Sequence, residues 1–235
     1  MFYNAKLLSL RYYLQGLLIC FNIFLVQAQS DSIGYSAYQT ILDVSKGQLL
    51  VRLKSHRNKL EALTKELNKV EPSSSTYERI SKEIQIVTSQ RDSFNYNLIL
   101  AMKRHFTLSP VYFYYDRDHL ELKKNNFKSP LYLDSSLQPM LLPEFRNKTI
   151  VIMAQGQTEG QELDAFIFID AQGNSIPPPF PSYIRINSFR PVMNELAKTY
   201  YYDDNAVWYA KKIDKKLRKM YEKALKWKAK NYKWE

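Results

Sequence analysis

Two consecutive runs of residues repeat at alternating steps of three and four, and this spacing constrains the fold more than any other feature of the chain. The runs are Leu49, Leu53, His56, Leu60, Leu63, Leu67 and Val70, then Tyr77, Ile80, Ile84, Val87, Arg91, Phe94, Leu98 and Ala101. Such repeats are typical of helices that bury one narrow seam against a partner helix. Folding the second run back on the first places each a position opposite a d position. We therefore predict a long antiparallel coiled-coil helical hairpin over residues 41–107.

One predicted layer of this seam is polar, because His56 and Arg91 depart from the apolar pattern at the same height. A polar layer costs stability but penalises shifted registers, in which one of these groups would face leucine alone. We interpret the pair as register-setting. A proton switch or an anion site is the alternative interpretation.

The tip of the hairpin is predicted by local signals. Pro72 ends the first helix, since proline disfavours the helical conformation of the preceding residue. Ser75 and Glu78 have the spacing of a capping box, so we expect Ser75 to cap the second helix.

Residues 1–28 have the pattern of a signal peptide, and residues 29–40 form a loose lead-in. Lys6 and Arg11 precede an apolar stretch, and small residues end it at Ala28. Cleavage there would remove Cys20, the single cysteine of the chain. We therefore expect an exported protein without disulfides, periplasmic or associated with the cell surface in a bacterium. Retention of the segment as a membrane anchor is the alternative.

The second half of the chain predicts an antiparallel β unit over residues 108–187, so the fold class is α+β. Short runs rich in β-branched and aromatic residues alternate with turn residues. The expected strands are residues 111–115, 131–133, 149–154, 163–169 and 183–186. Because all of them follow the predicted hairpin, we expect a meander behind it.

Two helices are expected over residues 188–235, with Asp204 capping the second. Residues 211–235 hold 11 Lys or Arg and 3 Asp or Glu, a net of +8 in a chain of net charge +11. This basic amphipathic helix has three interpretations: its apolar stripe packs on the body, it lies on an anionic membrane or envelope surface, or it binds nucleic acid. An exported chain without a recognition motif disfavours nucleic acid. The residues proposed for surface contact are Trp208, Trp227, Trp234, Lys215, Lys219 and Lys226.

Catalytic motifs are lacking in the sequence, and we predict no catalytic residue, cofactor or metal. One cluster of acids and an imidazole follows a predicted strand: Asp116, Asp118, His119 and Glu121. Such groups could bind a divalent metal or act as an acid–base pair, but alternating charges after a strand usually form a solvated turn. A small hydrolase would need these groups to converge with another acid, such as Asp164 or Asp170.

Two functional hypotheses follow. The favoured one is a non-enzymatic adaptor of the cell envelope, whose hairpin docks a protein partner while the basic helix packs or contacts a surface. The alternative is the small metal-dependent or acid–base hydrolase. In outline, a basic exported protein with a helical hairpin on a small β body is similar to the periplasmic Skp-type holdase chaperones. Those proteins build the body from strands that flank the hairpin, whereas here the predicted strands all follow it.

Overall fold

The computed structural model describes residues 36–141, 149–158, 160–186 and 202–231. It has the expected mixed α+β composition, with helices packed against a five-stranded sheet. The chain is helical over residues 36–46. The elements that follow are β1 (Gln48–Leu53), α2 (Arg57–Leu67), α3 (Ser75–His105), β2 (Val111–Tyr115), a 3-10 turn (Asp116–Asp118), α4 (His119–Lys124), β3 (Ile150–Gln157), β4 (Asp164–Asp170), β5 (Tyr183–Arg185) and α6 (Tyr202–Asn231).

The segment Gln48–Leu53 is a strand, which corrects the prediction that the first helix of the hairpin runs through it. Gly47 ends the preceding helix, and a Cβ at this position would lie 2.4 Å from the carbonyl oxygen of Thr149. The strand is buried on both faces, with only Arg52 partly accessible. A short, nearly continuous apolar run is typical of a strand inside a parallel sheet. Leu49 and Leu53 therefore belong to the sheet and not to a helical seam.

The sheet has the order β2-β1-β3-β4-β5, and its pairing is mixed. β1 runs parallel to both β2 and β3, whereas β3, β4 and β5 are antiparallel. The predicted antiparallel meander is thus correct for the last three strands only. The parallel pairs arise because the chain leaves β1, passes through α2 and α3, and returns beside β1 as β2. One strand therefore precedes these helices, contrary to the prediction that all strands follow them.

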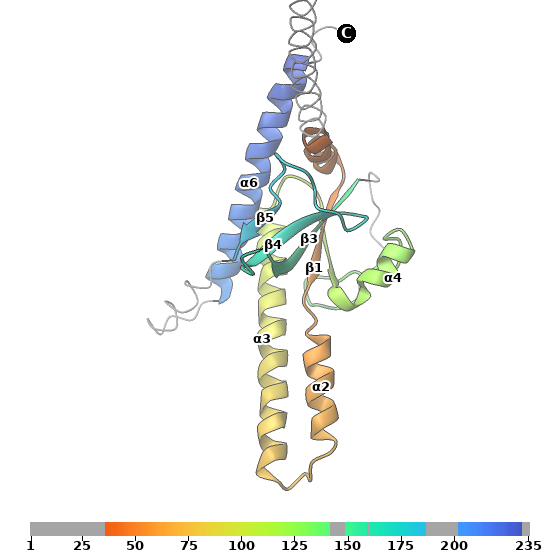
Figure 1. Cartoon of the computed structure of the whole chain (residues 1–235), viewed down its shortest axis with the longest axis vertical. Coiled ribbons are helices and arrows are strands. Elements are labelled where there is room, and N and C mark those ends of the chain that lie inside the picture. The colour runs from red at the N-terminus through yellow and green to blue at the C-terminus, as the bar shows by residue number, and fades with distance from the viewer. Residues whose placement is uncertain (1–35, 142–148, 159, 187–201, 232–235) are drawn as a thin grey trace, which may run out of the picture.

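Both faces of the sheet are covered. The larger core joins one face to α3, α6 and the helix at 36–46, with Leu49, Phe113 and Phe168 almost fully buried. α6 lies alongside the end of α3 and the edge of the sheet (Figure 1). The smaller core covers the other face near β1 and β2, where Tyr132 and Leu122 pack around Leu50.

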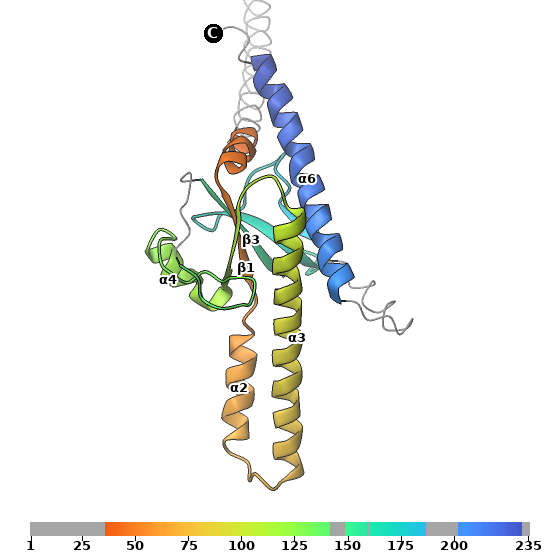
Figure 2. The ribbon, with the colours of Figure 1, turned by 180° about the vertical axis from the view of Figure 1, so that it is seen from behind.

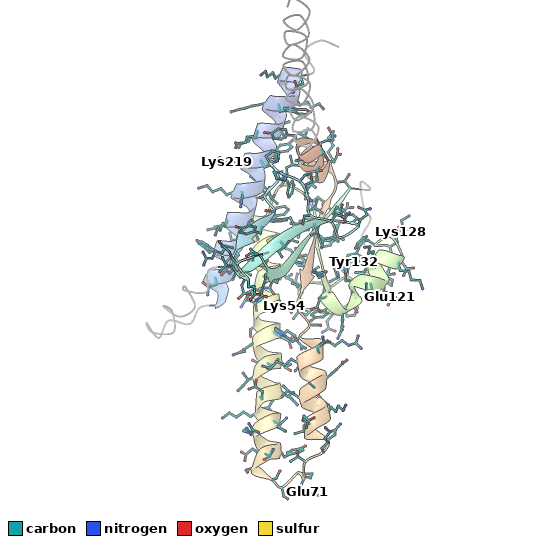
Figure 3. All side chains as sticks on the ribbon, in the orientation of Figure 1. Lys54, Glu71, Glu121, Lys128, Tyr132 and Lys219 are labelled. Carbon is teal, nitrogen blue, oxygen red and sulfur yellow. The ribbon has the colours of Figure 1, made fainter. Side chains whose placement is uncertain are left out.

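Helix α3 has 31 residues and continues well beyond the sheet. The shorter α2 lies beside it, connected through residues 68–74, and both views show the pair projecting from the body (Figures 1 and 2). We call residues 57–105 the α2–α3 arm. Glu71 marks its far end in Figure 3.

Several predicted features lie outside the described residues: the signal peptide, the first C-terminal helix at 188–199 and Trp234. The predicted strand at 131–133 contributes an isolated bridge between Leu133 and Phe113. α6 begins at Tyr202, so Asp204 lies within the helix and does not precede it as a cap. Among the described helices, none combines the length and apolar character needed to cross a membrane.

Candidate docking arm and its polar base

The tip of the arm is fixed by a single serine. The Ser74 hydroxyl accepts a hydrogen bond from the backbone N–H of Tyr77, at 3.1 Å. Ser74 has the extended backbone of an N-cap, and Glu78 lies in the first turn of α3, where a carboxylate favours the helix dipole. The cap is therefore Ser74, one residue before the predicted Ser75.

The apolar residues between α2 and α3 are only half-buried. Leu60, Leu63 and Leu67 are all partly accessible, and α2 contains no buried residue. On α3, Ile80 and Ile84 are also partly accessible. Two helices alone cannot enclose a seam between them, so its two long edges stay open to solvent or to another chain.

One ion pair joins the two helices along this seam. Lys59 Nζ on α2 lies 2.9 Å from Glu83 Oε1 on α3. In the predicted register both are g positions, which pair with one another in an antiparallel coiled coil. Both side chains are about half exposed, so the pair adds orientation more than stability.

Three side chains hold the base of the arm by binding the main chain between β1 and α2. The side-chain amide of Asn95 donates to the Lys54 carbonyl oxygen at 3.0 Å. Arg91 Nη1 donates to the Ser55 carbonyl oxygen at 3.3 Å. Asp116 Oδ1 accepts from the Ser55 N–H at 3.0 Å. Because Asn95 and Ser55 are buried, these bonds are shielded from water. They fix the point where the arm leaves the sheet.

His56 lies at this base but does not form the predicted helical layer. It precedes α2 in the left-handed conformation, with φ of 53°, and its side chain makes no cap hydrogen bond. No hydrogen bond or ion pair among the described residues joins its ring to Arg91. Burial and then Lys54 lower the pKa of His56, and Arg91 adds a smaller effect in the same direction.

A hollow of about 550 Å³ opens beside the base, where the parallel strands β1 and β2 both end. Its lining combines His56 with Asp116, so it joins the two groups of residues that the sequence singled out. Ligands of open α/β sheets bind outside the carboxyl ends of such strands. Here, however, the charges are already satisfied. Arg57 pairs with Glu61 at 2.6 Å, and Asp116 is occupied by the Ser55 N–H.

The remaining members of the predicted acidic cluster point to separate partners. Asp118 lies 3.6 Å from Arg117, and burial raises the pKa of its carboxyl. His119 Nδ1 lies 3.0 Å from the Tyr114 hydroxyl, and burial lowers the pKa of the imidazole. Glu121 is exposed on α4. These groups therefore lie in the turn and short helix that follow β2 and do not converge on one point.

Neither of the additional acids joins this cluster. Asp164 and Asp170 are at opposite ends of β4, which is separated from β2 by β1 and β3. Asp170 Oδ1 accepts from the Asn174 N–H at 2.8 Å. Across the described ranges, no three His, Cys, Asp or Glu side chains are placed to hold a metal ion. The convergence that a hydrolase needs is therefore not seen.

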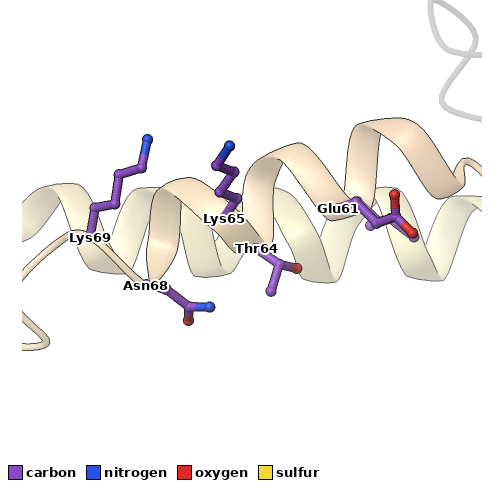
Figure 4. A pocket seen from close by; sticks show the side chains of 6 residues that line it. Glu61, Thr64, Lys65, Asn68 and Lys69 are labelled. Atoms are coloured by element: carbon purple, nitrogen blue, oxygen red, sulfur yellow. The ribbon is translucent and has the colours of Figure 1, made fainter.

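A second hollow of about 500 Å³ lies on the arm itself (Figure 4). Its walls come from one segment alone: Leu60, Glu61, Thr64 and Lys65 on α2, then Asn68 and Lys69 just beyond its end. No second element closes it, and no converging set of polar groups lines it. It belongs to the open edge of the seam.

The C-terminal helix packs on the body, as the first interpretation of its apolar stripe predicts. Ile213, Leu217, Met220 and Ala224 are all buried in the larger core. Trp227 stacks on Tyr38 with ring centroids 5.6 Å apart, and Trp208 lies under Lys212. Lys215, Lys219 and Lys226 are exposed, as expected for a surface face (Figure 3 labels Lys219).

Sequence reasoning missed Asn95 as a functional residue of the base. It lies directly after the seam residue Phe94, and a buried amide in such a position usually has a specific hydrogen-bond partner. That partner, the Lys54 carbonyl, is 41 residues away in the chain and belongs to a segment predicted as helix.

Comparisons with known proteins give no relative. No protein family, curated protein or solved structure matches this chain. The function is therefore inferred from the sequence and from the arrangement of the described residues.

Proposed function

We propose that the protein is a non-enzymatic docking module of the bacterial cell envelope, in which the α2–α3 arm is an antiparallel coiled-coil hairpin that holds a protein partner. The observation that carries the proposal is the half-buried state of Leu60, Leu63 and Leu67 on a helix pair that projects from the body. A helix laid along such an edge would complete a three-helix seam, the helix-in-groove mode of recognition.

The chemistry of one edge supports this mode. On the side of the seam opposite the Lys59–Glu83 pair, the flanking residues beyond the base are Thr64, Ser81 and Thr88, while Arg57 at the base is paired with Glu61. These small uncharged side chains allow close approach of another helix and impose little desolvation cost. Long charged side chains, in contrast, protect the edge that carries Lys59 and Glu83.

A rigid base suits docking, because a partner held on a fixed rod keeps a defined position relative to the sheet. Asn95, Arg91 and Asp116 provide that base. Preorganisation of this kind reduces the entropy lost on binding.

Export is part of the proposal and is supported by the pattern of residues 1–28. It predicts that the protein recovered from cells begins at Gln29 and partitions with the envelope. N-terminal sequencing of the purified protein tests this, and a mature chain that begins at Met1 would contradict it.

The docking function is tested by photo-crosslinking in native cells, with a benzophenone amino acid placed singly at Thr64 or Thr88 on the open edge. We expect both positions to give adducts of the same partner. Matched positions at Glu78 and Lys124, which are exposed but lie away from this edge, should give none. Absence of an adduct at both edge positions would overturn the proposal.

The molecule bound at the open edge is then identified from the mass of the crosslinked adduct. A partner protein gives an adduct larger than the monomer by the mass of that protein, whereas a second copy doubles the mass. Light scattering of the purified chain distinguishes these outcomes. If the occupant is a second copy, the purified chain is a dimer in solution, and if it is another protein, the purified chain is a monomer.

The seam itself is tested by engineered cysteine pairs in a Cys20→Ser background. The proposed register brings Leu63 and Ile84 together, so the pair Leu63→Cys and Ile84→Cys should form a disulfide under mild oxidation. The control pair Leu63→Cys and Ile80→Cys, one helical turn out of register, should not. Equal crosslinking of both pairs would contradict the coiled-coil register.

A further inference from the structure

The exposed side of α6 is the most strongly charged surface of the described residues. Residues 211–231 contain ten Lys or Arg and two Asp or Glu, a net charge of +8. One of the two acids is held in an ion pair, and the other is exposed. Asp214 is bound by Arg218 at 2.8 Å, and Glu222 lies among the lysines.

Two of the cations are turned toward the body and are not part of this surface. Lys216 Nζ donates to the Tyr183 carbonyl oxygen at 2.9 Å, and Lys212 Nζ donates to the Arg185 carbonyl oxygen at 3.4 Å. They cover the outer carbonyl groups of the edge strand β5, and burial lowers the pKa of both ammonium groups.

Six of the exposed lysines form one stripe. Lys211, Lys215, Lys219, Lys223, Lys226 and Lys230 are all exposed and make no ion pair within the described part of the chain. Their spacing of three or four residues places them within an arc of about 120° over roughly 28 Å of helix. We call these six residues the lysine stripe.

The opposite side of α6 is already occupied. Ile213, Leu217 and Ala224 are completely buried against the body, and Trp227 stacks on Tyr38. An amphipathic helix that enters a membrane interface must bury its apolar face there. In α6 this would require the core to open, so only contacts through charge are available to the lysine stripe.

We propose that the lysine stripe binds the surface of an anionic lipid bilayer through charge alone, without insertion of α6. A straight row of flexible ammonium groups matches a plane of phosphate head groups. The stripe contains no arginine for bidentate phosphate recognition. Trp227, the aromatic residue nearest the stripe that could stack on bases, is held against Tyr38, which disfavours single-stranded nucleic acid.

The proposal does not depend on the docking function of the arm, because no residue of the arm enters it. A variant of the stripe should leave arm crosslinks unchanged, and a variant of the arm should leave lipid binding unchanged. Failure of one proposal is therefore distinguishable from failure of the other.

The test is co-sedimentation of the full chain lacking only residues 1–28 with vesicles of phosphatidylcholine, alone or with 30% phosphatidylglycerol. We expect binding to the anionic vesicles only. The variant Lys215→Glu, Lys219→Glu and Lys226→Glu should bind about 100-fold more weakly, since each lysine near the surface contributes roughly a factor of five. The control Lys65→Glu, Lys82→Glu and Lys124→Glu changes the net charge equally and should stay within about twofold of the parent.

The effects of salt and of a competing polyanion on vesicle binding distinguish contact through charge from insertion of α6. Binding should disappear at 500 mM NaCl, where charges more than a few ångströms apart are screened. Binding that persists in high salt would indicate insertion and overturn the proposal. Equal weakening of binding by the control variant would also overturn the proposal. Displacement of the protein from vesicles by duplex DNA, with the lipid in excess, would overturn it too, because the surface would then bind polyanions in general.

Discussion

The side-chain amide of Asn95, buried within α3, donates a hydrogen bond to the carbonyl oxygen of Lys54 across 3.0 Å. This bond joins α3 to the main chain that leaves β1. It shows that the arm is not attached by a free linker but is held at its base.

The first prediction concerns this bond. Asn95→Ala removes the donor and leaves the Lys54 carbonyl unsatisfied in a buried place, which should lower the free energy of unfolding by about 2 kcal/mol. Urea unfolding measures the change. Asn97→Ala is the matched control, since it alters helix propensity equally but removes no hydrogen bond within the described residues, and it should change stability by less than about 0.5 kcal/mol.

The second prediction distinguishes strand from helix at β1. In the structure a Cβ at Gly47 would meet the Thr149 carbonyl oxygen at 2.4 Å, so Gly47→Ala should destabilise the protein by about 1–3 kcal/mol. If the first helix continued through Gly47, the same change would stabilise it by about 1 kcal/mol. The sign of the change in the free energy of unfolding, measured with urea, distinguishes the strand from a continued helix.

Gly156→Ala is the control for steric crowding. There the Cβ would meet Ile167 Cδ1 at 2.7 Å, the end of a flexible side chain that can move. We expect it to cost less than Gly47→Ala. An equal cost at both positions would contradict the close approach of backbone at Gly47.

The long helix, the turn at Pro72 and the strand at 111–115 were predictable from sequence because their determinants are local. The run from Leu49 to Leu53 was not. Leu49 and Leu53 fit the heptad spacing by coincidence, while Gly47 and the nearly continuous apolar run favour a strand. A short apolar run cannot be assigned from periodicity alone, and length and flanking residues must decide.

The candidate site was predictable only in part for the same reason. Arg91 was expected opposite position 56, and the structure places it against the neighbouring Ser55 carbonyl. The role of Asn95 depends on the position of α3 beside the chain that follows β1, 41 residues away. The role of Asp116 depends on the parallel pairing of β1 with β2, which brings it to Ser55, 61 residues earlier in the chain. Local sequence carries no information on such pairing.

The third prediction tests the cap of α3. Ser74→Ala removes the acceptor of the Tyr77 N–H and should cost about 1 kcal/mol. Ser75→Ala, at the first helical residue, should cost nothing, because alanine favours the helix. Thermal unfolding of both variants checks the assignment. A larger loss at Ser75 would restore the capping box predicted from sequence.

The fourth prediction concerns pH. The pKa of His119 is lowered from 6.5, first by burial and then by Arg52 and Lys123, so the folded state favours the neutral ring. Its contribution to stability is complete above pH 6.5 and is lost as the pH falls through the lowered value. In the tautomer that carries its proton on Nε2, Nδ1 accepts from the Tyr114 hydroxyl, and protonation of the ring removes this acceptor. Melting temperatures should therefore fall between pH 7.5 and 5.0.

The variant His119→Gln isolates this contribution, because glutamine does not titrate but can still accept from Tyr114. Its melting temperature should fall less over the same pH range. His105→Gln is the control, as the pKa of that ring is also lowered but its side chain forms no hydrogen bond in the described ranges. If His119→Gln kept the full pH dependence, the Tyr114–His119 contact would not be its source.

The central claim is that the α2–α3 arm is a rod fixed to the sheet. Its most direct test is a double electron–electron resonance measurement between spin labels at Glu71→Cys, on the tip, and Lys124→Cys, on α4, in a Cys20→Ser background. We predict a single narrow distance distribution that broadens in Asn95→Ala. A broad distribution in the parent protein would show a hinged arm and contradict the account.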